Sequence, residues 1–231
     1  METLTTLRTS LWMAAGVLIA TAQFTLAADF SLKTKESKPP ESVSIEIAGS
    51  LSSSVYEISK GDKTLYRFWF GKAIKLKAKP DTPGNGLDQF VQPSVLGVVE
   101  VLEEHRDYRD DELFENTFII RYGIRPNDGN HLGTSDFRHF GVLVPAEKDT
   151  QLDGIDGYKS LVKASSFDTV SDHPVILSLR PVDGDAGSTP SLQEPAPDHH
   201  ALRVKANGAV EGGEEQIPVV FDLVFEGFAE F

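Results

Sequence analysis

Short segments in which apolar and polar residues alternate make up most of the chain from residue 43 onward. In residues 73–79, for example, apolar side chains alternate with lysines at positions 75, 77 and 79. Such alternation, rich in β-branched and aromatic residues, is typical of strands with one buried face. The pattern predicts strands at 43–49, 64–70, 73–79, 94–102, 117–123, 140–146, 174–180, 200–206 and 217–231.

One segment has helical spacing instead. Ile155, Tyr158, Leu161 and Val162 fall on one face of a 3.6-residue period, which predicts a short helix over residues 155–166. Strands of parallel α/β sheets alternate with helices along the chain, whereas the strands predicted here follow one another with only this one helix. We therefore predict an all-β fold, an antiparallel β-sandwich of the immunoglobulin-like or jelly-roll kind, with a barrel as the alternative.

The first 42 residues differ from the rest in pattern. Arg8 precedes an apolar run at 11–22, and Thr25 and Ala27 then give the T-x-A arrangement that signal peptidase accepts. This order is typical of a signal peptide over residues 1–27, because the run is shorter than the roughly 20 residues that span a bilayer. An uncleaved membrane anchor is the alternative. Residues 28–42 are polar and predict a flexible spacer, which leaves 43–231 as a single sandwich domain.

Composition narrows the cellular context and the partners. The chain has no cysteine, so its core must rest on apolar burial; with the signal pattern, this predicts a secreted or periplasmic protein of a bacterial envelope. Acidic residues outnumber basic ones by 35 to 22, a net charge of −13. Such a charge repels nucleic acid and anionic lipid, so we expect neither as a partner, and no membrane insertion after signal removal. A protein or a carbohydrate remains as the expected partner.

Residues 121–140 contain two histidines, two aspartates and three arginines, between two apolar runs. Long loops in compact domains commonly carry function, and guanidinium groups at a strand end bind carboxylates and phosphates. The segment predicts a ligand-binding site made by Arg121, Arg125, Asp128, His131, Arg138 and His139. Internal ion pairing of these arginines with acidic residues of the chain is the alternative.

The same segment contains a candidate metal site. His131, His139, Asp128 and Asp136 offer the nitrogen and oxygen donors that zinc and copper accept. None of the established zinc-ligand spacings is present, so no cofactor is predicted, and a divalent metal is kept as the alternative.

The sequence shows no catalytic signature. The G-x-S-x-G motif of the α/β hydrolases is absent, and the acidic turns lack the ligand spacing of an EF-hand. The leading hypothesis is an exported, non-enzymatic binding or interaction module that uses loops 79–93, 124–139 and 181–199 at one end of the sandwich. The alternatives are a metal-binding protein or metal-dependent enzyme that uses His131 and His139, and a structural component of the cell envelope.

Overall fold

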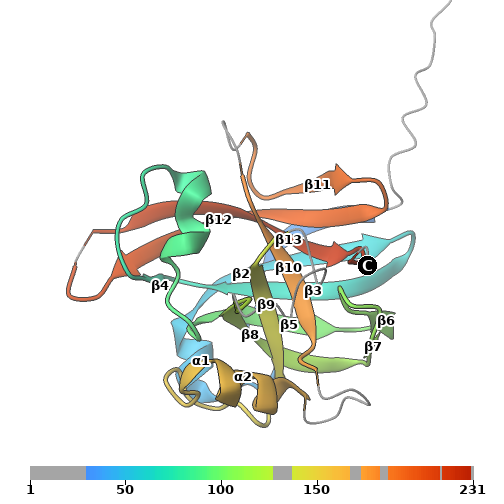
Figure 1. Cartoon of the computed structure of the whole chain (residues 1–231). Coiled ribbons are helices and arrows are strands. Elements are labelled where there is room, and N and C mark those ends of the chain that lie inside the picture. Colours follow the sequence, from blue (N-terminus) through green and yellow to red (C-terminus); the bar gives the residue numbers. More distant parts are fainter. Residues whose placement is uncertain (1–29, 127–136, 167–172, 183–186, 214, 230–231) are drawn as a thin grey trace, which may run out of the picture.

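The computed structural model describes residues 30–126, 137–166, 173–182, 187–213 and 215–229 (Figure 1). The fold is mostly β, with 51% of the described residues in strands and 13% in helices, which confirms the predicted all-β class. The strands are β1 Phe30–Glu36, β2 Leu51–Lys60, β3 Lys63–Gly71, β4 Ile74–Leu76, β5 Val95–Val101, β6 His105–Arg106, β7 Glu112–Leu113, β8 Asn116–Ile124, β9 His139–Pro145, β10 Ile176–Pro181, β11 Ser191–Ala196, β12 His199–Val210 and β13 Ile217–Glu226. The helices are α1 Ile45–Ser50, α2 Gly157–Ser165 and the 3-10 helix η1 Pro83–Gln89.

Most strands belong to one large sheet in the order β1-β2-β3-β5-β8-β9-β10-β13-β12-β11. Neighbouring strands along this path are antiparallel, while β4 joins β12 as a short parallel partner. β6 and β7 form a separate two-stranded hairpin. The β8–β9 and β9–β10 pairs place three neighbouring strands side by side, and these strands carry the candidate site.

The large sheet folds over on itself, so its two halves form the two layers of a sandwich-like fold (Figure 1). Aromatic rings of β3 meet rings of β13 across the interior: Phe70 lies 6.1 Å from Phe221, and Tyr66 lies 5.9 Å from Phe225, between ring centroids. Residues from β2 to β13 share this main core. The sequence predicted two packed layers, and the structure shows that both belong to one continuous sheet.

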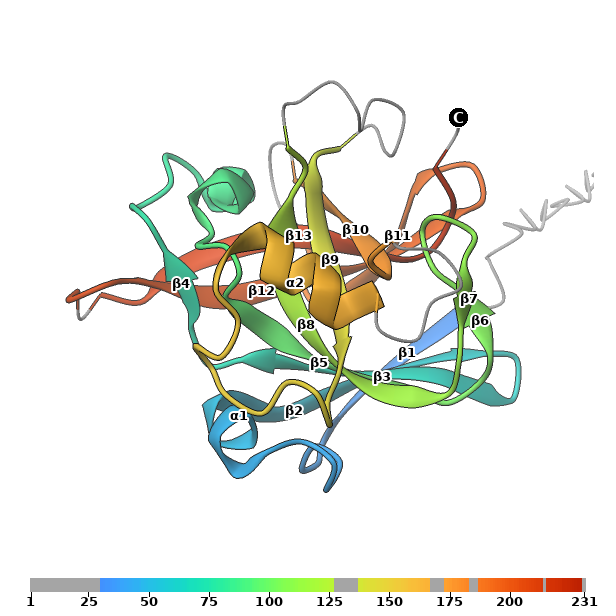
Figure 2. The same ribbon diagram turned by 60° about the horizontal axis from the view of Figure 1, so that its bottom comes forward.

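Parts of the sheet are covered on the outer face as well. α1 places Ile47 against Val55 of β2 and Trp69 of β3, in a second apolar cluster. α2 lies across β8 and β9, where Leu161 packs with Phe140 and other apolar residues in a third cluster (Figure 2). The strand β9 is buried along its whole length for this reason, which explains why its sequence is apolar without alternation.

Several local predictions were wrong. The predicted spacer at 28–42 contains β1, which pairs along its whole length with β2 as a largely exposed edge strand. The predicted strand at 43–49 is α1, because Ser44 caps a helical turn by accepting a hydrogen bond from the amide of Ile47. The predicted loop at 181–199 contains β11, which pairs with β12. The strand β2 was not predicted, because its first half is rich in serine.

The predicted helix at 155–166 is confirmed as α2. The predicted signal peptide, residues 1–27, lies outside the described residues. Among the residues that the structure describes, no helix is long and apolar enough to cross a membrane.

Candidate functional site

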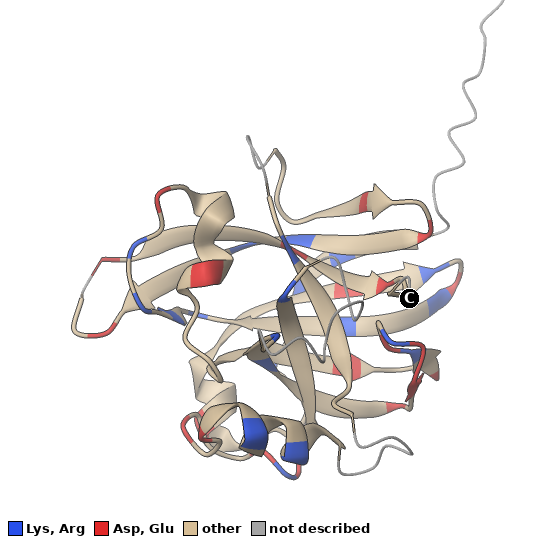
Figure 3. Cartoon of the chain, viewed as in Figure 1, with Lys and Arg blue, Asp and Glu red and all other residues tan. Residues whose placement is uncertain are grey.

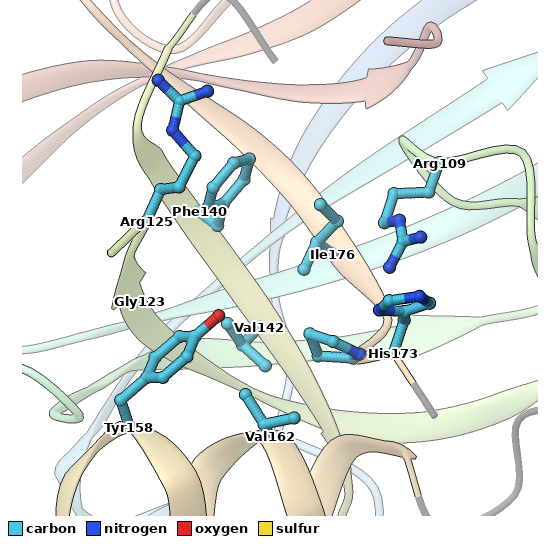
Figure 4. A pocket seen from close by; sticks show the side chains of 10 residues that line it. Arg109, Gly123, Arg125, Phe140, Val142, Tyr158, Val162, His173 and Ile176 are labelled. Carbon is cyan, nitrogen blue, oxygen red and sulfur yellow. The ribbon is translucent and has the colours of Figure 1, made fainter. Parts of the chain in front are cut away.

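A cavity of about 180 Å³ lies between α2 and the outer face of β8, β9 and β10 (Figure 4). Gly123, Phe140, Val142 and Ile176 form its floor, and α2 covers it with Tyr158 and Val162. Arg125 lies at one end beside Phe140, and Arg109 and His173 lie at the other end beside Ile176. The walls are therefore largely apolar, and cationic groups stand at both ends.

Two anchors hold α2 over this floor. At the C-terminal end of the helix, the Ser165 hydroxyl donates to the Leu143 carbonyl of β9 at 2.6 Å and accepts from the Val175 amide at 2.9 Å. The hydroxyl thus ties the helix to β9 and to the residue before β10. The other anchor is the connection from β9 to α2, which is fixed by a buried arginine.

Arg121 projects from the outer face of β8 and is only 1% exposed. Its guanidinium pairs with both carboxylate oxygens of Asp149, with 2.7 Å between Nη2 and Oδ1. The other N–H groups donate to the carbonyls of Pro93, Gln151 and Leu152, at 2.6 to 3.0 Å. All five donors of the guanidinium are therefore used inside the chain. Arg121 therefore forms an internal ion pair, the alternative to ligand binding that its sequence context allowed, and it offers no donor to a ligand.

A tight turn at residues 107–111 presents Arg109 to the cavity. The Asp107 carboxylate accepts hydrogen bonds from the amides of Arg109 at 2.8 Å and Asp111 at 3.0 Å. Its second oxygen accepts from the Ile176 amide at 2.9 Å, which docks the turn onto the start of β10. Burial raises the pKa of Asp107 to about 6, and the three amide donors only partly oppose this effect. Asp107 positions Arg109 relative to the cavity floor.

The Arg109 guanidinium points toward the His173 ring at the end of the cavity (Figure 4). Its Nε atom is buried and has no hydrogen-bond partner among the described residues. A buried N–H group without a partner is costly in a folded protein. Opposite Arg109, the Tyr158 hydroxyl points from α2 toward Val142. The helix adds further positive charge, because its charged residues are Lys159 and Lys163 (Figure 3).

The predicted site residues do not form one cluster, because successive side chains of a strand point to opposite faces. Arg125 lines the cavity on the outer face. Arg125 and Arg138 lie opposite each other just beyond the last residue pair of β8 and β9, and the Arg125 amide donates to the Arg138 carbonyl at 2.8 Å. His139, one residue further, points to the inner face and meets Tyr122.

His139 belongs to a buried contact between the sheet and η1. The Tyr122 hydroxyl lies 2.8 Å from the Leu87 carbonyl oxygen and 2.7 Å from Nδ1 of His139. Since the hydroxyl donates to the carbonyl, Nδ1 carries the proton that the tyrosine oxygen accepts. Burial lowers the pKa of His139, and the nearby Asp88 carboxylate, 3.5 Å from Nε2, opposes that effect. The residue therefore helps to attach η1 at the same end of the sheet as the predicted binding loops.

The metal alternative depends mainly on residues that lie outside the described part of the chain, namely Asp128, His131 and Asp136. Asp128 and His131 also belong to the predicted ligand site. Within the described ranges, no group of three or more histidine or acidic side chains is arranged to hold a metal ion. The ring nitrogens of His199 lie 2.8 and 2.9 Å from the backbone carbonyl oxygens of Pro197 and Phe228, so both face the main chain.

Arg109, Tyr158, His173 and Phe140 were not predicted as site residues. The available signal was the run from 140 to 146, which is apolar at successive positions and not only at alternate ones. Such a run indicates a strand covered on both faces, and hence a second apolar layer outside the main core. Which residues form that layer depends on how the 107–111 turn and α2 dock, and those contacts are distant in sequence. A comparison of the chain with protein-family models, curated proteins and solved structures found no match.

Proposed function

We propose that this chain is a non-catalytic binding protein whose cavity under α2 accepts a small apolar molecule that carries an acidic group. The observation that supports it is the position of Arg109, which brings an unpartnered, buried guanidinium N–H to the end of an apolar cavity. A carboxylate at that end gives the guanidinium a charge-assisted partner, while the rest of the ligand contacts the apolar floor.

The volume limits the size of the ligand. An apolar protein cavity of about 150 Å³ holds one benzene molecule, so a cavity of about 180 Å³ suits one ring or a similar branched chain. The apolar floor disfavours a carbohydrate, because the hydroxyl groups of a sugar need many polar partners. We infer an aromatic or short branched carboxylic acid as the ligand class.

Calorimetric titration with benzoate and with benzyl alcohol tests this proposal. The two probes share the ring and differ in charge. A ligand of benzoate size gains about 0.5 kcal/mol per heavy atom, so we expect a dissociation constant on the order of 0.1–1 mM for benzoate. Arg109→Gln removes a hydrogen bond to a charged group, so benzoate binding weakens by about tenfold or more while benzyl alcohol binding changes little.

Two variants of α2 test the location. Val162→Phe fills the cavity from the helix and should abolish binding of both probes. Ser160→Phe places the same ring on an exposed position of the same helix and should leave binding unchanged. Equal affinity for benzoate in the wild type and in Arg109→Gln, or full binding by Val162→Phe, would contradict the proposal.

We also propose that the chain is exported, on the basis of the signal pattern in residues 1–27. Mass spectrometry of the chain recovered from a bacterial envelope fraction tests this. A mature N-terminus near residue 28 is expected, and an intact N-terminus in the cytosolic fraction would contradict it.

A further inference from the structure

In both layers of the sandwich, the edge strand is shorter than the strand it pairs with. β1 pairs with β2 only as far as Ser54, although β2 begins at Leu51. β11 pairs with β12 only over residues 199–203, although β12 continues to Val210. A cavity of about 360 Å³ lies between the two layers at this place, lined by the start of β2, the end of β3 and residues 205–207 of β12. This β2–β12 cavity has the size of a usual ligand site, which is about 300–1,000 Å³.

The backbone of β12 at Lys205 has no strand partner beside this cavity. Asn207 lies opposite Pro218 of β13, which has no N–H group, so these two residues are not a hydrogen-bonded pair. Bonded and non-bonded pairs alternate in an antiparallel ladder, so the amide and carbonyl of Lys205 also point away from β13. On that other edge of β12, β11 ends at Arg203 and β4 begins at Gly208. The described residues therefore leave one donor and one acceptor of the Lys205 backbone unpaired.

Tyr56 adds an aromatic surface and a hydroxyl group to the β2–β12 cavity. Its half-buried ring packs against Phe70, with 5.8 Å between the ring centroids. Burial raises the pKa of Tyr56, so the hydroxyl keeps its proton, and it has no hydrogen-bond partner among the described residues. Asn207 and Gln216 also line the cavity, and each amide side chain both donates and accepts. The wall thus combines an aromatic ring with several neutral donors and acceptors.

The charged residues of this wall are all basic. The described residues that line the cavity include Lys72 and Lys205 and no acidic residue. Nζ of Lys72 donates to the neutral Gly49 carbonyl at 2.8 Å, which uses one of its three N–H groups. Lys205 forms no ion pair with a described residue. A more open hollow of about 580 Å³ adjoins the cavity, since Ser52 and Lys72 line both, and it leaves room for a longer ligand.

We propose that the β2–β12 cavity binds a saccharide that carries a carboxylate, of the uronic acid class. The C–H face of the sugar ring packs on the accessible part of Tyr56, as apolar groups do on aromatic rings. The sugar hydroxyls need polar partners when they leave water, and the Lys205 backbone and the amides of Asn207 and Gln216 supply them. The carboxylate gives the ammonium groups of Lys72 and Lys205 a charged partner. This site stands apart from the cavity under α2, because the two share no lining residue.

Titration of the full chain with glucuronate tests the site, with sodium chloride adjusted to keep the ionic strength constant. A ligand of about 13 heavy atoms, at the binding efficiency of drug-sized molecules, has a dissociation constant on the order of 1 mM. Calorimetry should therefore show weak but saturable binding. Glucose, which has the ring without the charge, should bind at least fivefold more weakly. Acetate, which has the charge without the ring, should not compete at the same concentration.

Two substitutions separate the ring contact from the charge. Tyr56→Leu removes the aromatic ring and should weaken binding of both sugars at least fivefold. Lys205→Gln removes one charge and should lower the affinity for glucuronate toward that for glucose, while glucose binding stays unchanged. Lys33→Gln is the matched control, because Lys33 is also an exposed strand lysine but lies outside the cavity; it should bind glucuronate like the wild type.

Circular dichroism melts show whether each variant is folded, and Lys205→Gln, at an exposed position, keeps the test valid if Tyr56→Leu does not fold. Val162→Phe, which fills the cavity under α2, should leave glucuronate binding unchanged. Absence of saturable glucuronate binding, equal affinity for glucose, or wild-type affinity in both Tyr56→Leu and Lys205→Gln would overturn the proposal. Loss of glucuronate binding in a folded Val162→Phe variant would overturn its separation from the cavity under α2.

Discussion

Asp149→Asn tests the ion pair that holds the connection between β9 and α2. Arg121 and Asp149 have side chains that are each 1% exposed, so the substitution leaves a buried guanidinium without its counter-ion. Breaking a buried pair by removing one partner costs about 3–5 kcal/mol. Because asparagine keeps one acceptor oxygen in the same place, we expect the lower part of this range, about 3 kcal/mol. For a chain of this size, that loss lowers the melting temperature by about 6–12 °C.

Urea unfolding followed by far-ultraviolet circular dichroism measures the change in unfolding free energy. Glu103→Gln is the control, because its pair with Lys63 has side chains that are 40% and 69% exposed and should contribute less than about 1 kcal/mol. A loss below about 1 kcal/mol for Asp149→Asn, or one equal to that of the control, would refute the reasoning about burial.

The double variant Arg121→Met with Asp149→Leu separates the contribution of the ion pair to stability from that of the hydrogen bonds between Arg121 and the backbone carbonyls. Replacing both members of a buried pair with apolar residues is often neutral or stabilising. Here Arg121 also donates to the carbonyls of Pro93, Gln151 and Leu152, which lose their partner. We therefore expect the double variant to remain less stable than the wild type by about 2 kcal/mol or more. A fully stable double variant would show that these carbonyl contacts contribute nothing.

Three further predictions concern the turn, the η1 attachment and the sheet. The pKa of Asp107 is raised from its ordinary value of about 4 to about 6, so the folded chain binds more protons than the unfolded chain between these values, and its stability falls as pH rises through this window. The effect on the free energy of unfolding is at most about 3 kcal/mol, at 1.36 kcal/mol per pH unit. Urea titrations at pH 4 and pH 7 measure how much the free energy of unfolding changes between the two pH values. This change should be smaller for Asp107→Asn than for the wild type, and equal changes would contradict the assignment. Tyr122→Phe leaves the buried Leu87 carbonyl and the His139 ring without the hydroxyl, so it should cost about 1–3 kcal/mol in urea unfolding, and a neutral result would count against the hydrogen-bonded contact. Gly97→Ala places a methyl group 2.2 Å from the Trp69 carbonyl oxygen, so it should abolish cooperative unfolding or sharply lower the melting temperature, whereas normal stability would argue against the β3–β5 register.

Much of the fold was predictable because a strand buried on one face has apolar and polar residues at alternate positions of its sequence. The strand β3 was predicted correctly for a different reason, because it is rich in large aromatic residues, which favour strands and here pack on both faces. The strand β1 shows no such alternation, because its side chains are mostly exposed and its pairing with β2 uses backbone groups that every residue possesses. The helix α1 was missed because Ile45 and Ile47 mimic strand alternation, although Ile45 is 93% exposed and only Ile47 reaches the core.

The site was less predictable for a related reason. The sequence indicated that residues 121–140 matter, and Arg125 does line the cavity. Strand alternation, however, sends His139 to the opposite face, and the partner of Arg121 lies 28 positions away in a loop. Arg109 and Ile176 lie in separate segments, and only the docking of the 107–111 turn onto β10 brings them to one cavity. No local pattern encodes that docking.

The most direct test of the account is a two-dimensional amide NMR titration of the isotopically labelled chain with benzoate. Shift changes should be saturable and concentrated at the amides of Gly123, Val142, Tyr158 and Ile176, and they should vanish in Val162→Phe. Shifts that spread over the surface without saturation, or that centre away from α2 and β8–β10, would contradict the assignment of this cavity as the binding site.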